Sequence, residues 1–151
     1  MANVSALCGS FKAEVLSGIH ALGVTVVRAA TTVDTVKGAL YLASGSLGVA
    51  TTAYSATSEV SGTNYTAGGV TVTNATAPVL NGTEADWTPS ASIVYTNVTL
   101  ATSFDTLLLY NSTQSNRAIG VFTFGAQTVT SGTLTLTMPA NTAGVALVRI
   151  A

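Results

Sequence analysis

The chain has 151 residues, a net charge of −1, five Lys and Arg residues and six Asp and Glu residues. Charged residues make up 7% of the sequence, against roughly 25% in an average soluble domain, while hydrophobic residues make up 48%. This balance excludes an intrinsically disordered chain, and no apolar run approaches the length of a membrane-spanning helix. We therefore expect one folded domain that has no membrane partner.

Threonine is the most conspicuous residue, at roughly a sixth of the chain against a few per cent in ordinary proteins. Its branched side chain favours strands, and hydroxyls and amides replace Lys and Glu on the predicted polar faces. Such a surface has little charge to prevent association. A small monomer kept soluble by hydroxyls is one interpretation. A chain that works inside an assembly is the interpretation we favour, because interface cores are poor in charge.

The cationic residues are scattered along the sequence, at Lys12, Arg28, Lys37, Arg117 and Arg149. They form no basic stripe that would neutralise a phosphate backbone, so nucleic acid is not an expected partner. The single Cys8 has no internal disulfide partner and is expected to be a small buried side chain. No secretory leader is evident, which predicts synthesis in the cytoplasm without export by that route.

Residues 1–20 differ from the rest of the chain and are predicted to form a short helical docking segment, followed by one β-domain over residues 21–151. Ser10 is a suitable N-cap, Gly18 a suitable end, and Phe11, Val15 and Ile19 share one helical face. Two helical turns are not stable alone in water, so this segment must dock on the domain or on a neighbouring subunit. The candidate partner-contact residues are Phe11, Val15, Leu16, Ile19 and Trp87.

Strand patterns dominate from Leu22 onward. Residues 133–138 alternate Thr with Leu or Met, which predicts one buried and one wetted face, whereas residues 107–110 are apolar throughout and are expected to be covered on both faces. Turn signals separate the runs. The predicted fold class is all-β, a β-sandwich or jelly roll with a short N-terminal helix. The expected strands lie near 22–29, 35–43, 67–73, 92–100, 104–110, 117–124, 127–137 and 145–150.

The breaks between strands contain residues that tolerate positive φ or lack an N–H. Asn81-Gly82, Ser131-Gly132 and Gly68-Gly69 are predicted turns. The three prolines are placed between runs or at their ends, where a missing donor does no harm.

Groups capable of catalysis are few. His20 is the only histidine, and no second His or Cys pair is present to bind zinc. Glu84 and Asp86 are the closest acid pair, and we interpret them as a solvated loop rather than a calcium site, which needs more oxygen ligands. The sequence therefore predicts a protein that is not an enzyme and has no cofactor and no metal.

Residues 54–69, YSATSEVSGTNYTAGG, resemble a motif in small structural proteins of tailed bacteriophages. Residues 34–41, 110–118, 124–125 and 138–151 are similar to the same Thr-rich virion proteins. The resemblance implies a capsid cement or decoration protein with a jelly-roll-like fold, and it implies no catalytic residues.

The same motif has a physical interpretation. Glu59 is a lone charge in an uncharged loop, where it either accepts backbone N–H bonds or pairs with Arg117. Tyr54 and Tyr65 are expected to pack the loop down. Gly68 and Gly69 then let the chain turn into the next strand. A structural role for this loop is favoured over ligand binding.

The leading functional hypothesis is a cement protein that binds the outside of a phage shell and bridges major capsid protein subunits, as a homo-oligomer located in the virion. A tail, neck or baseplate module is the second hypothesis. The third is a carbohydrate-binding module for host recognition, which requires an exposed aromatic platform such as Trp87 with Tyr95.

Overall fold

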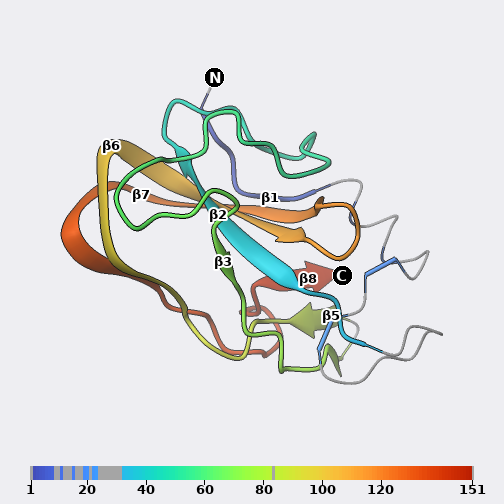
Figure 1. Ribbon diagram of the computed structural model, residues 1–151. Helices are drawn as coiled ribbons and strands as arrows, with labels where there is room; N and C mark the ends of the chain where they lie inside the picture. Colours follow the sequence, from blue (N-terminus) through green and yellow to red (C-terminus); the bar gives the residue numbers. More distant parts are fainter. Residues whose placement is uncertain are drawn as a thin grey trace.

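Two antiparallel sheets make up the protein, which is all-β as expected and has the layout of a β-sandwich (Figure 1). The computed structural model describes residues 2–8, 11, 15, 19–20, 22–23, 32–82 and 84–150. The larger sheet has the strand order β1-β7-β6-β2-β3, and the smaller has the order β4-β5-β8. The strands are β1 (Ala6–Leu7), β2 (Val36–Leu42), β3 (Val70–Thr71), β4 (Val79–Asn81), β5 (Glu84–Trp87), β6 (Ile93–Asn111), β7 (Arg117–Leu136) and β8 (Val148–Ile150).

The two longest strands, β6 and β7, form a hairpin that makes up most of the larger sheet. The two strands pair from Asn111 with Arg117 at the turn to Ile93 with Leu136 at the far end. The register shifts several times along the way, and Asn97 and Ser131 have positive φ angles of 52° and 46°. Such bulges add twist and bend, which is why the hairpin curves in Figure 1.

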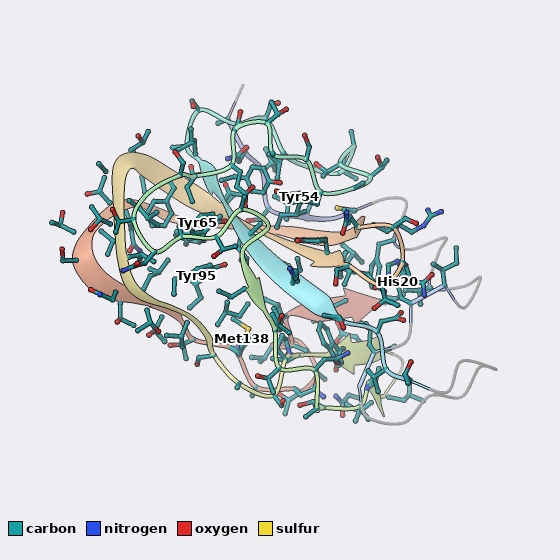
Figure 2. The ribbon with its side chains drawn as sticks, in the orientation of Figure 1. His20, Tyr54, Tyr65, Tyr95 and Met138 are labelled. Carbon is teal, nitrogen blue, oxygen red and sulfur yellow. The ribbon has the colours of Figure 1, made fainter. Side chains whose placement is uncertain are left out.

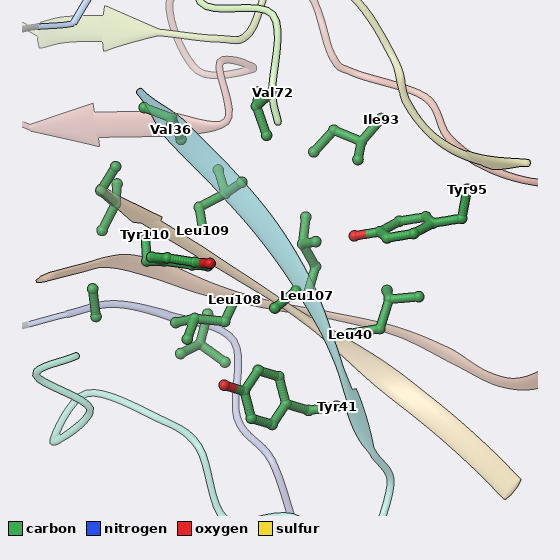
Figure 3. Packing of buried hydrophobic residues seen from close by; sticks show 14 of the residues in the cluster. Val36, Leu40, Tyr41, Val72, Ile93, Tyr95, Leu107, Leu108, Leu109 and Tyr110 are labelled. Atoms are coloured by element: carbon green, nitrogen blue, oxygen red, sulfur yellow. The ribbon is translucent and has the colours of Figure 1, made fainter. Parts of the chain in front are cut away.

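The core lies on the part of this sheet where β2 pairs with β6. Leu107, Leu108, Leu109 and Tyr110 are all at most 2% exposed, which confirms the prediction that this run is covered on both faces. Strand alternation sends Leu107 and Leu109 to one face and Leu108 and Tyr110 to the other. In Figure 3 these side chains lie on β6, with Leu40 and Tyr41 of β2 beside them.

The first residues of the chain belong to the β-domain. Ala6 and Leu7 pair with Val121 and Gly120 of β7. The buried Asn3 amide donates to the Leu42 carbonyl at 3.0 Å, and its oxygen accepts the Leu47 N–H at 2.8 Å. These contacts join residues 3–8 to the larger sheet and its loops, and the division of the chain at residue 20 stays a prediction.

Among the described residues, helical conformation occurs only at Phe11 and Val15, and no complete helix is described. Of the helix expected over residues 10–18, only Phe11 and Val15 are described, and the rest of that prediction lies outside the described residues. The strand expected at 22–29 also lies outside them, apart from Leu22 and Gly23, which are not in a strand.

The expected strands near 35–43, 67–73 and 145–150 are present as β2, β3 and β8, and the four expected between 92 and 137 merge into β6 and β7. Ser131-Gly132 was predicted as a break between strands, and this is wrong, because it is a bulge inside β7. Asn81-Gly82 joins β4 to β5 as predicted, with a Gly82 φ of 67°.

The prediction of a solvated loop at Glu84 and Asp86 is also wrong. Both residues lie in β5, and Asp86 is only 1% exposed. Pairing with β4 on one side and β8 on the other orders this segment. A three-residue strand such as β4 is too short to give a periodic signal in the sequence.

Candidate functional site

The Glu59 carboxylate lies at the centre of the loop between β2 and β3. Its Oε2 accepts the Tyr54 hydroxyl at 2.6 Å, and its Oε1 accepts the Tyr65 hydroxyl at 2.8 Å and the Gly68 N–H at 2.7 Å. Tyr110 of β6 completes the group by donating to the Gly68 carbonyl at 2.8 Å. We call these five residues the Glu59 cluster. The prediction that Glu59 holds the loop by accepting a backbone N–H is confirmed.

Stacked rings hold the same loop against the sheet. Tyr54 stacks on Tyr110 with ring centroids 4.9 Å apart, and Tyr65 stacks on Tyr95 at 5.9 Å. The remaining tyrosine, Tyr41, donates to the Ser55 carbonyl at 2.5 Å. Figure 2 labels Tyr54 and Tyr65 on the loop, together with Tyr95 of β6. All five tyrosines of the chain therefore help to fix one loop.

The loop also seals the edge of β2. The Leu42 N–H donates to the Ser58 carbonyl at 2.9 Å, and the Val60 N–H donates to the Leu40 carbonyl at 3.0 Å. The Leu40 N–H donates to the Tyr65 hydroxyl at 3.0 Å, so this one hydroxyl is both acceptor and donor. Each of these bonds removes an unpaired backbone group from an edge that would otherwise be open to other chains.

Gly69 is required by a close approach of two backbones. Its φ is 68°, and a Cβ atom at this position would lie 1.7 Å from the Gly38 carbonyl oxygen of β2. Gly68 has a φ of 87°, so the pair turns the chain into β3 as predicted.

Burial keeps the tyrosines of this region protonated. Desolvation, together with the hydrogen bond to the Glu59 carboxylate, raises the pKa of Tyr54 to about 12. Desolvation likewise raises the pKa of Tyr65, Tyr95, Tyr41 and Tyr110 above the ordinary value. None of these phenols is poised to lose a proton near neutral pH, so the tyrosines of the Glu59 cluster remain hydrogen-bond donors there.

Arg117 lies beside the cluster through its backbone. It forms an isolated bridge with Ala53, and the neighbouring Tyr54 N–H donates to the Asn116 carbonyl at 2.9 Å. These contacts tie the loop to the start of β7. The alternative that Glu59 pairs with the Arg117 guanidinium stays a prediction.

The partner-contact residues are placed differently from the cluster. Phe11 is fully buried and Trp87 is 2% exposed, with its indole N–H donating to the Thr76 carbonyl at 3.0 Å. Their rings are covered by the chain itself, so they are not presented to a partner in this structure. Val15 and Ile19 are half-buried, and Leu16 lies outside the described residues.

Phe11, Val15 and Trp87 come together around one apolar pocket of about 120 Å³. The pocket is lined by Phe11, Val15, His20, Leu22, Pro78, Ala85, Asp86, Trp87, Val148 and Ile150. It is therefore where the N-terminal segment meets the small sheet. The sequence predicted that both regions make contacts and missed that they contact each other.

A buried polar network surrounds the only histidine. The Asn111 side-chain amide lies 3.1 Å from His20 Nδ1 and donates to Asp34 Oδ2 at 2.8 Å. Gln114 donates to the other Asp34 oxygen at 3.3 Å. The His20 ring also packs edge-on against Phe11, with centroids 4.7 Å apart. These contacts hold the His20 side chain inside the domain.

Metal binding finds no support in the part of the chain that the structure describes, since no three His, Cys, Asp or Glu side chains gather there. Among the same residues, no helix is long and apolar enough to cross a bilayer. Comparisons with protein-family models, with curated proteins and with solved structures each find no match.

Replacing Glu59 tests whether the cluster holds the loop. In Glu59→Gln one acceptor oxygen becomes a donor facing a tyrosine hydroxyl, and we expect the free energy of unfolding to fall by about 1–3 kcal/mol in urea titrations. Glu84→Gln is the matched control, because Glu84 accepts one backbone N–H, that of Gly144 at 3.0 Å, and has a 3.4 Å ion pair with the 45% exposed Arg149, but accepts no tyrosine hydroxyl. We expect this variant to lose at most about 1 kcal/mol. Equal losses in the two variants would contradict a special role for Glu59.

Gly69 and Gly82 have nearly the same φ, so replacing each by Ala separates the cost of a steric clash from the cost of a left-handed backbone conformation. Gly69→Ala forces a Cβ onto the Gly38 carbonyl, whereas Gly82→Ala, at a φ of 67°, meets nothing within 4 Å. We expect Gly82→Ala to cost about 1 kcal/mol and Gly69→Ala to cost several times more, measured by thermal unfolding. A loss at Gly69 no larger than at Gly82 would show that the close approach to β2 is absent.

The raised tyrosine pKa values predict a loss of stability in alkali. The folded state holds these protons more tightly than the unfolded state, so the contribution is complete below about pH 10 and falls as the pH rises above it. For Tyr54 the fall continues to about pH 12. Unfolding titrations across this range, with tyrosinate absorbance followed in parallel, should show ionisation and unfolding together. Ionisation of all five tyrosines near pH 10 in a folded protein would contradict the burial described above.

Proposed function

We propose that this chain is a non-catalytic structural protein of a phage particle, a cement or decoration protein that binds the outside of the shell and bridges major capsid protein subunits. One observation carries the contact role: the extended surface of β7 offers hydroxyls and almost no charge. Exposed side chains along it include Thr128, Thr130, Thr133 and Thr135. Charged residues commonly make up roughly a quarter to a third of the surface of a free monomer. An uncharged surface therefore favours a protein that is part of an assembly.

The assignment to a phage particle rests on the sequence resemblance of residues 54–69 to virion proteins. The structure supplies a physical reason for the residues of that motif, since Glu59, Tyr54, Tyr65 and Gly69 each make a contact that fixes the loop. A loop fixed by polar contacts presents a shape to a partner without folding on binding, which lowers the entropic cost of association. This supports a preformed contact module.

Many weak contacts suffice for a protein of this kind. A shell offers repeated sites, and a homo-oligomer that engages two or more of them gains affinity through its effective concentration. An interface of about 1,600 Å² would be ordinary for each contact. No catalytic group is required for this work, in keeping with the protonated tyrosines and the structural setting of His20.

The carbohydrate-binding alternative requires an exposed aromatic platform, and the two rings expected to form it are buried. Trp87 and Tyr95 are each 2% exposed, and the Tyr95 hydroxyl donates to the Gly38 carbonyl at 2.8 Å inside the domain. Sugar stacking requires an open aromatic face. These two rings do not provide one.

The copy number in purified particles tests the proposed location. We expect hundreds of copies, as a shell component requires, measured by quantitative mass spectrometry against the major capsid protein. About six or twelve copies, as a closed ring gives, would place the chain in the tail, neck or baseplate instead. Absence from the particles would contradict the virion assignment altogether.

Particle binding is best tested with the complete chain. Removing residues 1–20 would also remove β1 and the buried Cys8 and Phe11, so loss of binding by that truncation would report misfolding as much as lost contact. Purified full-length protein should cosediment with shells that lack it. Binding of the full chain to tails alone would overturn the shell assignment.

A further inference from the structure

The two edges of the larger sheet differ in how many of their backbone groups are paired. On the β2 side, β3 pairs with Lys37 and Gly38, and loop residues satisfy the edge as far as Leu42. The Tyr65 hydroxyl covers the remaining Leu40 N–H. This edge is closed to other strands.

The opposite edge, along β7, is mostly open. β1 pairs only with Gly120 and Val121, and the Thr123 N–H donates to the Ser5 hydroxyl at 2.5 Å. From Phe124 to Leu136, no described strand other than β6 pairs with β7. In Figure 1 the orange ribbon of β7 runs along the outer side of β6. Its outward backbone groups are free to pair with another strand.

The devices that normally protect such an edge are largely missing from it. Natural edge strands carry Lys, inward charges or Pro to prevent pairing with other chains. Here the sequence from Ala118 to Val148 contains no Asp, Glu, Lys or Arg, and its one proline, Pro139, lies beyond the strand. The bulge at Ser131 divides the edge, and beyond it residues 132–136 alternate between the two faces of the sheet, opposite one further register shift of β6 between Tyr95 and Val98.

This stretch is suited to pairing with itself. Thr133 and Thr135 are exposed, while Leu134 is 7% exposed and Leu136 is half-buried. Antiparallel strands from two copies are related by a two-fold axis perpendicular to the sheet, which keeps each face on its own side. Thr133 and Thr135 therefore lie opposite residues of the exposed, hydroxyl-rich face of the second copy. Leu134 and Leu136 lie opposite residues of its apolar face. Both kinds of cross-strand pair are favourable.

Charge also favours a second copy over a different partner. Like charges directly opposite each other destabilise a pair of strands, and residues 132–136 contain no charge to repel a second copy. It equally offers no charge for an oppositely charged partner to recognise.

We propose that residues 132–136 of β7 pair antiparallel with the same residues of a second copy, so that two five-stranded sheets join into one continuous sheet. The inference rests on the proposed contact role, and it deepens that role by naming the surface through which copies associate. The small sheet and the Glu59 cluster lie outside the pairing stretch.

The test is the oligomeric state of the full chain and two double-lysine variants, measured by sedimentation equilibrium from micromolar to millimolar concentration. Thr133→Lys with Thr135→Lys places like charges across the proposed two-fold axis. The matched control, Thr128→Lys with Thr130→Lys, adds the same charge to the same strand on the other side of the bulge. Circular dichroism and thermal unfolding confirm that each variant is folded.

We expect the unaltered chain and the control to form dimers, and the Thr133 and Thr135 variant to raise the dissociation constant at least about tenfold. A monomeric unaltered chain would overturn the proposal, as would a control that dissociates as readily as the test variant. The outcome is independent of the virion assignment: a dimer absent from particles contradicts only the proposed function, and a monomer found in particles contradicts only the self-pairing.

Discussion

The three hydrogen bonds accepted by the Glu59 carboxylate are the interaction on which the rest of this structure depends. They fix Tyr54, Tyr65 and the Gly68 backbone in one place. The loop so fixed closes the edge of β2 and covers one face of the core. A charged acceptor makes stronger hydrogen bonds than a neutral one, which suits a loop that has few apolar side chains of its own. A single acidic residue thus organises a segment with no other charge.

The arrangement gives a consistent account of a chain with so few ionisable groups. The tyrosine hydroxyls, the Asn111 network and the Thr-rich strands satisfy polar atoms without charge, and the core of β2 and β6 is apolar. The surface that remains presents many hydroxyls, the open backbone edge of β7 and a few exposed apolar side chains such as Val49 and Leu80. The proposed function requires only shape and contact area from this surface.

The sequence predicted the fold class and most of the larger sheet, because the alternation in residues 133–138 and the apolar run at 107–110 extend over enough residues to give a clear period. It also predicted the part played by Glu59, whose isolation from other charges marked it. It missed β1, β4 and β5, which are too short to show a period and are stabilised by their partners. The burial of Trp87 and Asp86 depends on the docking of β8 and the N-terminal segment, and such long-range contacts leave no local pattern.

Opening of the closed edge of β2 would change how copies of the protein associate. Local opening of the Glu59 cluster would release the loop without unfolding the hairpin, since none of the three hydrogen bonds to the Glu59 carboxylate belongs to the pairing of β6 with β7. The molecule would then have two free edges, one at β2 and one at β7. A two-edged building block no longer stops at a pair, because heterologous addition at both sides propagates without closure and produces fibres. One carboxylate would in that sense separate a discrete assembly from an open-ended polymer.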